Sequence, residues 1–274
     1  MKIGLHESTW WYTSIDPIDG IKIAKKIGFD AYDVFPGHEI SIKQKRAIRE
    51  TLEENGLKCS ALTLVATALS DFSDAVRDFT TRWVKENLDF AYDLEAETFC
   101  LPLGEYVWEK QEIRPEIQWN WTVEKVREIG DYAQGLGIPV GLELHAHKTS
   151  LIYSVDLMKK FLDDVNHPFV MANADVSHLH IMKDPPKKLW DLKGRIVHVH
   201  FSDNNGIVHG DLPPGRGTAP LKEYLRTLNE MGFDGTATIE LEFSPDPDKI
   251  IEWVTEAYVN TARMMSELGI RSKT

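Results

Sequence analysis

The sequence has only two cysteines among its 274 residues, Cys59 and Cys100. Both lie inside apolar, strand-like runs, which fits a reducing compartment and argues against a disulfide framework. An uninterrupted apolar run of membrane-spanning length is also missing, because the longest, around Ala61–Leu69, is broken by threonines. The first residues lack the apolar stretch of a secretion signal. We therefore expect a cytoplasmic protein that does not enter a membrane.

Positive charge is scarce as well. The chain carries 31 Lys and Arg against 43 Asp and Glu, a formal net charge of −12. This balance argues against a nucleic-acid partner, because binding to a phosphate backbone needs clustered basic side chains. No Gly-x-Gly-x-x-Gly loop follows the first strand-like run, which disfavours a dinucleotide-binding fold. What the composition leaves unexplained is histidine: eight of the ten lie between His145 and His209.

Short apolar runs alternate with longer amphipathic stretches along the whole chain. We expect strands at Ile3–His6, Ala31–Phe35, Cys59–Val65, Thr98–Pro102, Val140–His145, Val170–Asp175, Ile196–Phe201 and Thr236–Leu241. We expect helices at Pro17–Ile27, Ile42–Glu54, Asp74–Asp93, Thr122–Gln134, Val155–Val165, Pro186–Leu192, Ala219–Met231 and Asp248–Leu268. Glycines mark the helix ends at Gly28, Gly56, Gly137 and Gly232.

Strict alternation of strands and helices predicts parallel strands joined by right-handed crossovers. Eight such units, each of roughly 30 residues, are the number at which a barrel closes. No linker or change of composition divides the chain. We therefore predict an α/β fold, a (β/α)8 TIM barrel with a single domain over residues 1–274, with an open doubly wound sheet as the alternative.

The carboxyl ends of the barrel strands, where the chemistry of such a fold lies, carry a repeated feature. Four consecutive strands end with an ionisable residue inside an otherwise apolar run, namely Glu143, Asp175, His200 and Glu240. Buried carboxylates facing one lumen repel each other, and a divalent cation resolves that conflict. Three carboxylates and one imidazole suit Mn²⁺, Mg²⁺ or Co²⁺, and Zn²⁺ accepts the same donors.

Each of these residues also has a structural alternative. Asp175 can cap the turn that follows it, Glu240 can pair with a basic side chain, and His200 can be a hydrogen-bonded core histidine. Their occurrence at matching ends of four successive strands favours the metal site. We expect His198 to pack one layer deeper on the same face. Two further carboxylates either orient ligands or are solvated at loop ends: Glu242 and Asp203.

The strand ends and the following loop contain a set of short motifs. These are Gly-Leu-Glu143, Asp175-x-x-His178, His-x-His200-x-x-Asp203, Pro214-Gly215-Arg216-Gly217 and Ile239-Glu240. Together they resemble the sugar-phosphate isomerase/epimerase group of barrels, which includes ketose 3-epimerases, inosose dehydratase-like proteins and xylose-isomerase-like barrels. The resemblance implies a proton transfer next to a sugar carbonyl that depends on a divalent metal, Mn²⁺ first, with Co²⁺, Mg²⁺ or Zn²⁺ as alternatives. It also implies four metal ligands, Glu143, Asp175, His200 and Glu240, and a substrate contact, His178.

Elementary chemistry is consistent with an acid/base role for Glu143 and Glu240. Removal of a proton next to a ketone builds an enediolate, whose charge a metal ion stabilises. Strands five and eight lie three apart in a ring of eight, so their carboxylates approach a substrate from different sides. Epimerisation needs one group that removes a proton and another that returns it. We therefore predict a metal-dependent sugar isomerase or epimerase.

Two departures from the pattern leave other outcomes open. The resemblance implies an arginine six residues after His200, where this chain has Gly206, and an Asn-Arg-Phe-Glu-like stretch after Glu143, where it has Leu144–Thr149. His145, two residues beyond Glu143, is a candidate general base or a substrate-orienting histidine. His209, in the long loop of residues 204–218, either reaches the pocket or is solvated.

The same enediolate can also expel a group by β-elimination. The alternative function is therefore a lyase, either the catalytic subunit of a 3-keto-glycoside or C-glycoside deglycosidase or an inosose dehydratase. A metal-binding partner subunit without activity is the non-enzyme alternative. We expect a small keto-sugar or glycoside as substrate, contacted also by His6 and Trp108, and a homo-oligomer or a hetero-oligomer with a second subunit. An endonuclease-like barrel is disfavoured by the acidic net charge.

Overall fold

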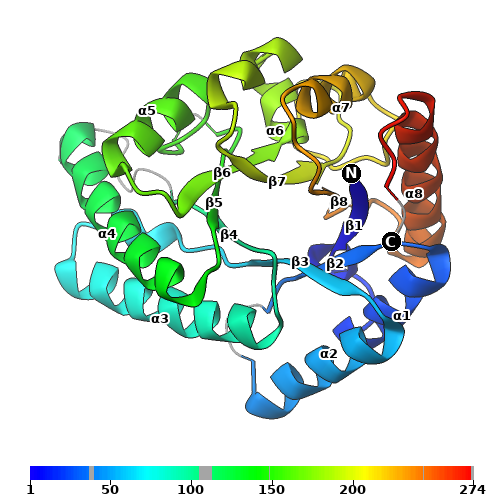
Figure 1. The fold of residues 1–274 in the computed structure, drawn as a ribbon, viewed down its shortest axis with the longest axis horizontal. Helices are drawn as coiled ribbons and strands as arrows, with labels where there is room; N and C mark the ends of the chain where they lie inside the picture. Colours follow the sequence, from blue (N-terminus) through cyan, green and yellow to red (C-terminus); the bar gives the residue numbers. More distant parts are fainter. Residues whose placement is uncertain (37–39, 105–112, 148, 243, 273–274) are drawn as a thin grey trace.

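The computed structural model describes residues 1–36, 40–104, 113–147, 149–242 and 244–272. Eight parallel strands close into a barrel in which each strand pairs with its neighbours in sequence and β8 pairs with β1 (Figure 1). The strands are β1 Lys2–His6, β2 Ala31–Val34, β3 Lys58–Thr63, β4 Thr98–Pro102, β5 Val140–Glu143, β6 Val170–Asp175, β7 Ile196–Phe201 and β8 Thr236–Ile239. The predicted TIM barrel is confirmed, and the open sheet is excluded because the ring has no edge.

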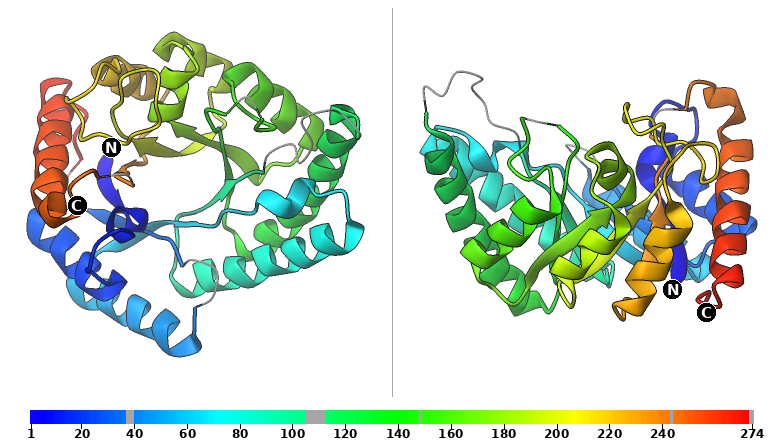
Figure 2. Two further views of the ribbon diagram at one scale, coloured as in Figure 1. Left: turned by 180° about the vertical axis from the view of Figure 1, so that it is seen from behind. Right: turned by 90° about the horizontal axis from the view of Figure 1, so that it is seen from above.

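The α-helices form an outer ring around the strands (Figures 1 and 2). They are α1 Pro17–Ile27, α2 Ile42–Asn55, α3 Asp74–Asp93, α4 Pro115–Leu136, α5 Val155–Val165, α6 Val176–Ile181, α7 Leu221–Glu230 and α8 Ile250–Glu267. Short 3₁₀ turns occupy Glu7–Trp10, Thr67–Ser70, Pro186–Leu192 and Pro247–Lys249. No helix within the described ranges is both long and apolar enough to cross a membrane.

Local chemistry sets the helix ends. At the start of α1 the Asp16 side chain accepts the backbone N–H of Asp19, and Pro17 occupies the first turn, where its missing N–H costs nothing. The helix ends at Gly28, whose φ of 116° lies in the left-handed region that favours glycine. Gly56 and Gly137 end α2 and α4 in the same way, as predicted. These ends return the chain to the barrel within one to three residues.

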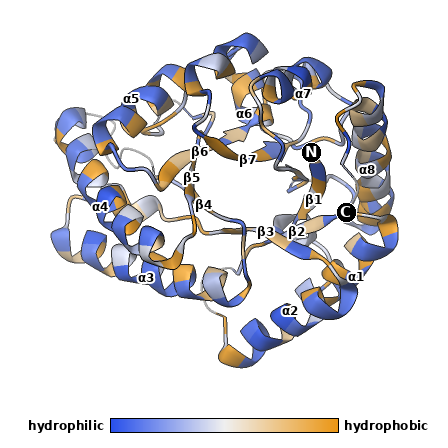
Figure 3. Ribbon diagram, in the orientation of Figure 1, coloured by the Kyte–Doolittle hydropathy of each residue, from blue (hydrophilic) through white to orange (hydrophobic). Residues whose placement is uncertain are grey.

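A continuous apolar core lies between the strands and the inner faces of the helices. Figure 3 shows the hydrophilic colour mainly on the outward faces of the helices. The strands are buried on both faces, as expected when helices cover one side of a parallel sheet and side chains fill the lumen. The loop after β7, yellow in Figure 2, lies on the opposite side of the barrel from the two chain ends. That side holds the carboxyl ends of the strands.

Some predicted elements differ from the structure. The fourth helix begins at Pro115 rather than Thr122. The segment Pro186–Leu192 is a 3₁₀ helix, and the helix that follows β6 is instead α6, which starts directly after Asp175. Its six residues are too few for periodicity to reveal. The fifth strand ends at Glu143, because the backbone N–H of His145 turns away to the carbonyl of Ile152.

Candidate metal centre and active site

The four predicted ligands converge at the carboxyl end of the barrel. Glu143 and Asp175 are the last residues of β5 and β6, His200 lies in β7, and Glu240 directly follows β8. All four are buried, and one candidate donor atom from each lies within 4.8 Å of the others. His200 Nδ1 lies 2.6 Å from Glu143 Oε1 and 3.2 Å from Glu240 Oε2. Neighbouring parallel strands place these side chains together, since Asp175 pairs with His200 in the register of β6 and β7.

The donor set suits a divalent cation. Three carboxylates surround one imidazole, and the buried Oδ2 of Asp175 has no hydrogen-bond partner among the described residues. Burial, and then the charge of Glu143, raises the pKa of Asp175 to about 7. Burial also raises the pKa of Glu240 well above its ordinary value, although His200 opposes the shift. A bound cation would replace the repulsion between these buried carboxylates with ligation.

Asp175 has a second role that the sequence left open. Its Oδ1 accepts the backbone N–H of His178 at 2.8 Å and caps α6. The capping alternative is therefore realised, and it occupies only one carboxylate oxygen. The other oxygen, Oδ2, is buried and accepts no hydrogen bond from the described residues.

Glu143 and His200 form a tight buried pair. Burial alone would raise the pKa of Glu143, but the charge and hydrogen bond of His200, together with the neighbouring His145, hold it well below its ordinary value. Burial alone would lower the pKa of His200, but Glu240 and Glu143 raise it well above its ordinary value. The Asn173 amide lies 3.3 Å from Glu143 Oε1 and 3.2 Å from His200 Nδ1, so it fixes both side chains.

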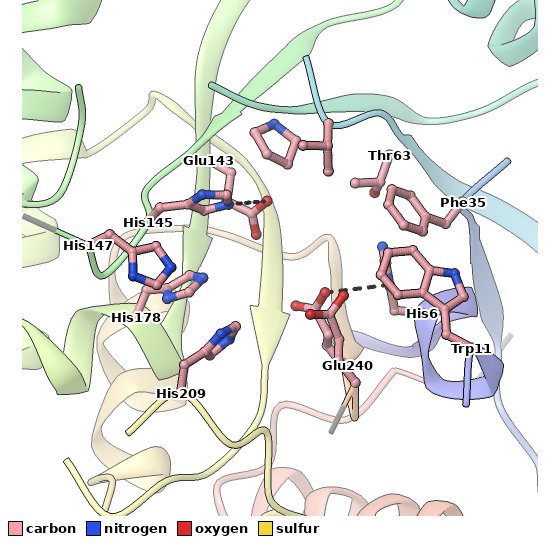
Figure 4. A pocket seen from close by; sticks show the side chains of 13 residues that line it. His6, Trp11, Phe35, Thr63, Glu143, His145, His147, His178, His209 and Glu240 are labelled. Carbon is pink, nitrogen blue, oxygen red and sulfur yellow. Dashed lines mark ion pairs between the residues drawn. The ribbon is translucent and has the colours of Figure 1, made fainter. Parts of the chain in front are cut away.

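A pocket of about 230 Å³ opens over this cluster (Figure 4). One wall is rich in histidine and comes from the loop after β5, from α6 and from the loop after β7. The opposite wall is apolar, and in it the rings of Trp11 and Phe35 lie 4.5 Å apart. The lining residues are His6, Trp11, Phe35, Thr63, Val65, Pro102, Glu143, His145, His147, His178, His209, Glu240 and Glu242.

The predicted general base His145 lies beside Glu143. Its Nε2 is 3.6 Å from Glu143 Oε2, and 22% of its side chain is exposed, against 5% for Glu143. His145 is therefore the more accessible of the two groups. Its ring centroid lies 5.1 Å from that of His178. The structure thus brings together the predicted base and the predicted substrate contact.

His178 and His6 are both held in defined orientations. Nδ1 of His178 accepts the backbone N–H of Ala146, so its hydrogen resides on Nε2, which faces Asp175. His6 Nδ1 lies 2.6 Å from Ser8 Oγ and 3.5 Å from Glu240 Oε1. Burial and the charge of His200 lower the pKa of His6 to about 3, so the ring is neutral. Trp108, the other predicted substrate contact, lies outside the described residues.

Sequence reasoning missed Asp33, a buried carboxylate in β2 that lies against His198 and His200 on the side away from the pocket. Its Oδ2 lies 2.6 Å from His198 Nε2 and 3.6 Å from His200 Nε2, and its Oδ1 accepts the Ser60 hydroxyl at 2.5 Å. Burial alone would raise the pKa of Asp33, but the two histidines hold it well below its ordinary value. The signal was present, since Asp33 is a lone charged residue inside the apolar run of β2. His198 is buried, as expected, with its Nε2 against Asp33.

Asp203 has a different role from either predicted one. Its side chain is 2% exposed, so it is not solvated. Among the described residues it forms no hydrogen bond or ion pair with a candidate metal ligand. Instead its carboxylate accepts four backbone N–H groups at 2.9 to 3.0 Å: those of Asn204, Gly215, Gly217 and Ala219. Asp203 thereby organises the loop between β7 and α7. Glu242, in contrast, lines the pocket.

The closed barrel, with acidic and histidine side chains converging where four successive strands end, defines a TIM barrel with a candidate metal-dependent active site. The chain belongs to the xylose isomerase-like TIM barrel family, whose model matches residues 21–259. It is 23% identical to L-ribulose-5-phosphate 3-epimerase UlaE of Escherichia coli, covering 86% of this chain and 88% of that protein. It is also 26% identical to fructoselysine 3-epimerase of Shigella flexneri. That match covers 46% of this chain and 47% of the epimerase, so it spans about half the length of the relative.

A solved structure supports the assignment of the fold. The IOLI protein, whose structure holds a zinc atom, superposes with a TM-score of 0.83 at 20% identity. The superposition covers 97% of this chain and 99% of that chain. At this level of identity the likeness concerns the fold alone.

Proposed function

We propose that this protein is a divalent-metal-dependent epimerase or isomerase that moves a proton next to the carbonyl of a keto-sugar. The observation that carries the proposal is the convergence of two carboxylates from different parts of the ring, Glu143 at the end of β5 and Glu240 directly after β8, within 3.2 Å of His200 Nδ1. Two bases on different sides of a substrate carbon are what inversion at that carbon requires. The names of the relatives, two of them 3-epimerases, support a keto-sugar as the substrate.

The four clustered residues, Glu143, Asp175, His200 and Glu240, would hold the metal. A bound ion would supply positive charge to the oxygen of the substrate carbonyl and so favour enolisation. Three carboxylates and one imidazole favour Mn²⁺, and the zinc in the IOLI structure makes Zn²⁺ a second choice.

The chain's own side chains would handle the proton. A carboxylate that also ligates a metal is a weaker base, so we assign His145, next to Glu143 and nearer the solvent, as a candidate partner in the transfer. The neutral ring of His178 would orient the substrate through Nε2–H. The apolar wall around Trp11 and Phe35 would exclude water from the opposite face of the sugar.

Deuterium wash-in tests the proposal. We would incubate the Mn²⁺-loaded protein in D₂O with D-tagatose, D-psicose, D-fructose and a panel of 3-keto-glycosides, and follow exchange by NMR. We expect label next to the carbonyl of a ketose in the wild type, and none in Glu143→Gln and Glu240→Gln, which should also bind Mn²⁺ more weakly. Glu252→Gln, on the exposed face of α8, is the matched control and should exchange normally.

The outcomes separate the candidate functions. Release of an aglycone from a 3-keto-glycoside, without exchange into any ketose, would replace epimerisation with β-elimination. Less than half an equivalent of bound metal after Mn²⁺ loading, with no exchange, would favour a partner subunit without activity.

A further inference from the structure

The loop between β7 and α7 borders the pocket and is held by hydrogen bonds within the loop. The carboxylate of Asp203 gathers backbone N–H groups from both ends of the loop, and an antiparallel bridge joins Asp203 to Leu212. Both elements fix the segment that carries His209. Figure 4 shows the His209 ring directed into the pocket, beside His178 and across from Glu240.

Asp211 anchors this histidine. Its side chain is fully buried, its Oδ1 accepts the Ser202 hydroxyl at 2.8 Å, and its Oδ2 lies 3.1 Å from His209 Nε2. The backbone of Asp211 has a φ of 36°, in the left-handed region that non-glycine residues rarely adopt. Such strain persists where the surrounding structure enforces it, and it concentrates at functional sites. The backbone strain at Asp211 thus accompanies the placement of its buried carboxylate against His209.

Two adjacent histidines thereby take different charge states. Burial alone would lower the pKa of His209, but Asp211, with Asp175 and Glu240, raises it to about 10, so the ring is an imidazolium near neutral pH. The ring centroid of His178 lies 4.3 Å away, and burial together with the charge of His209 lowers the pKa of His178 well below its ordinary value. One ring is a cation with two N–H donors, and its neighbour is neutral.

We propose that His209, held by Asp211, is a substrate-binding residue whose ring donates a hydrogen bond to an oxygen of the keto-sugar. The inference rests on the proposed function and deepens it. The histidine wall can meet the hydroxyl edge of a sugar, while the apolar wall around Trp11 and Phe35 meets its C–H face. In this role His209 would contact the substrate from the loop after β7, on the wall that also carries His178.

A second cation is the competing explanation for the same residues. Donor atoms of His209, Asp211 and Glu242 also lie within 4.8 Å of one another. The ion pair with His209 already balances the charge of Asp211, so no further cation is needed for that balance. Counting bound metal distinguishes the two explanations.

The test uses Mn²⁺-loaded protein and the ketose among D-tagatose, D-psicose and D-fructose that the wild type exchanges fastest. His209→Gln removes the charge and keeps a donor of similar size, and Asp211→Asn removes the partner of the imidazolium. Val208→Ala, on the same loop at a residue 59% exposed, is the matched control. Steady-state exchange rates give kcat and KM, and metal analysis gives the bound equivalents.

We expect His209→Gln to lower kcat/KM by about 10- to 100-fold, mainly through a higher KM, which is the usual worth of a hydrogen bond from a charged group. Asp211→Asn should follow in the same direction, Val208→Ala should match the wild type, and all should bind one equivalent of Mn²⁺. An unchanged KM in His209→Gln would overturn the inference alone. So would two bound equivalents in the wild type that fall to one in His209→Gln. A loaded wild type that exchanges no ketose would overturn the proposed function and this inference together.

Discussion

Replacement of Asp33 by asparagine tests whether the network beneath the centre sets the affinity for metal. His200 presents Nδ1 to Glu143 and Glu240, and its Nε2 faces Asp33 at 3.6 Å. Ligation through Nδ1 requires the ring hydrogen on Nε2, which a carboxylate opposite that atom favours. The carboxylate of Asp33 therefore selects the tautomer of His200 that can bind the metal.

The structure sets the size of the effect. Asp33 accepts the Ser60 hydroxyl on one oxygen and faces both histidines with the other. An asparagine offers only one acceptor oxygen, so its amide nitrogen must face either Ser60 or His198, and the negative charge is lost. Loss of such a partner behind a ligand typically weakens metal binding about 10- to 100-fold, which corresponds to about 1.4 to 2.8 kcal/mol.

Competition with a fluorescent chelator for Zn²⁺ measures this change in the folded protein, and urea unfolding reports the state of the fold. Ser60→Ala is the matched control, because it removes a hydrogen bond to the same carboxylate and keeps the charge opposite the histidines. We expect Ser60→Ala to change the affinity by no more than about threefold, within the range of one neutral hydrogen bond. Equal affinities for Asp33→Asn and the wild type, or equal losses in both variants, would refute the reasoning.

Three further predictions follow from other residues. His145→Ala should abolish isotope exchange with metal content unchanged if His145 is the base, and wild-type exchange rates would remove that assignment. Burial raises the pKa of Glu7 to about 8, so between about pH 4.5 and 8 the folded state retains a proton that the unfolded state releases. The free energy of unfolding therefore falls as the pH rises through this range, by up to about 1.4 kcal/mol per pH unit. Urea unfolding should therefore find Glu7→Gln more stable than the wild type at pH 8 and equal to it at pH 4, and parallel pH curves would contradict the shift. Asp203→Ala leaves four backbone N–H groups, one of them fully buried, without their acceptor, so thermal unfolding should reveal a loss of about 3 kcal/mol. A loss below about 0.5 kcal/mol, the range of an ordinary surface change, would mean that other groups hold the loop.

Much of the fold could be predicted because its signals are local. Apolar runs, amphipathic stretches and terminal glycines such as Gly28 and Gly137 each depend on a few neighbouring residues. The short helix α6 escaped because six residues span fewer than two turns. The 3₁₀ segment Pro186–Leu192 was predicted as a helix because its apolar spacing does not distinguish the two kinds of turn.

The candidate ligands could be found because a TIM barrel turns position along the chain into position in space. Once Glu143, Asp175, His200 and Glu240 were assigned to the carboxyl ends of adjacent strands, their convergence followed from the ring. Asp33 carries a similar signature in β2, but it stands apart from the four consecutive strands that carry the candidate ligands. Metal ligation by the four candidate ligands remains a prediction.

The sequence by itself determined the alternation of strands and helices and the set of ionisable residues at the strand ends, and it favoured a barrel over an open sheet. The tertiary structure decided that the sheet closes into a ring. Only the tertiary structure decided which of these residues act together. Asp33 and His198 lie 165 residues apart along the chain and 2.6 Å apart across the barrel, and no local pattern encodes that contact. The charge of His209 likewise depends on a strained, buried Asp211 and on carboxylates from other strands. Burial and proximity fix these properties, and both arise only when the ring has closed.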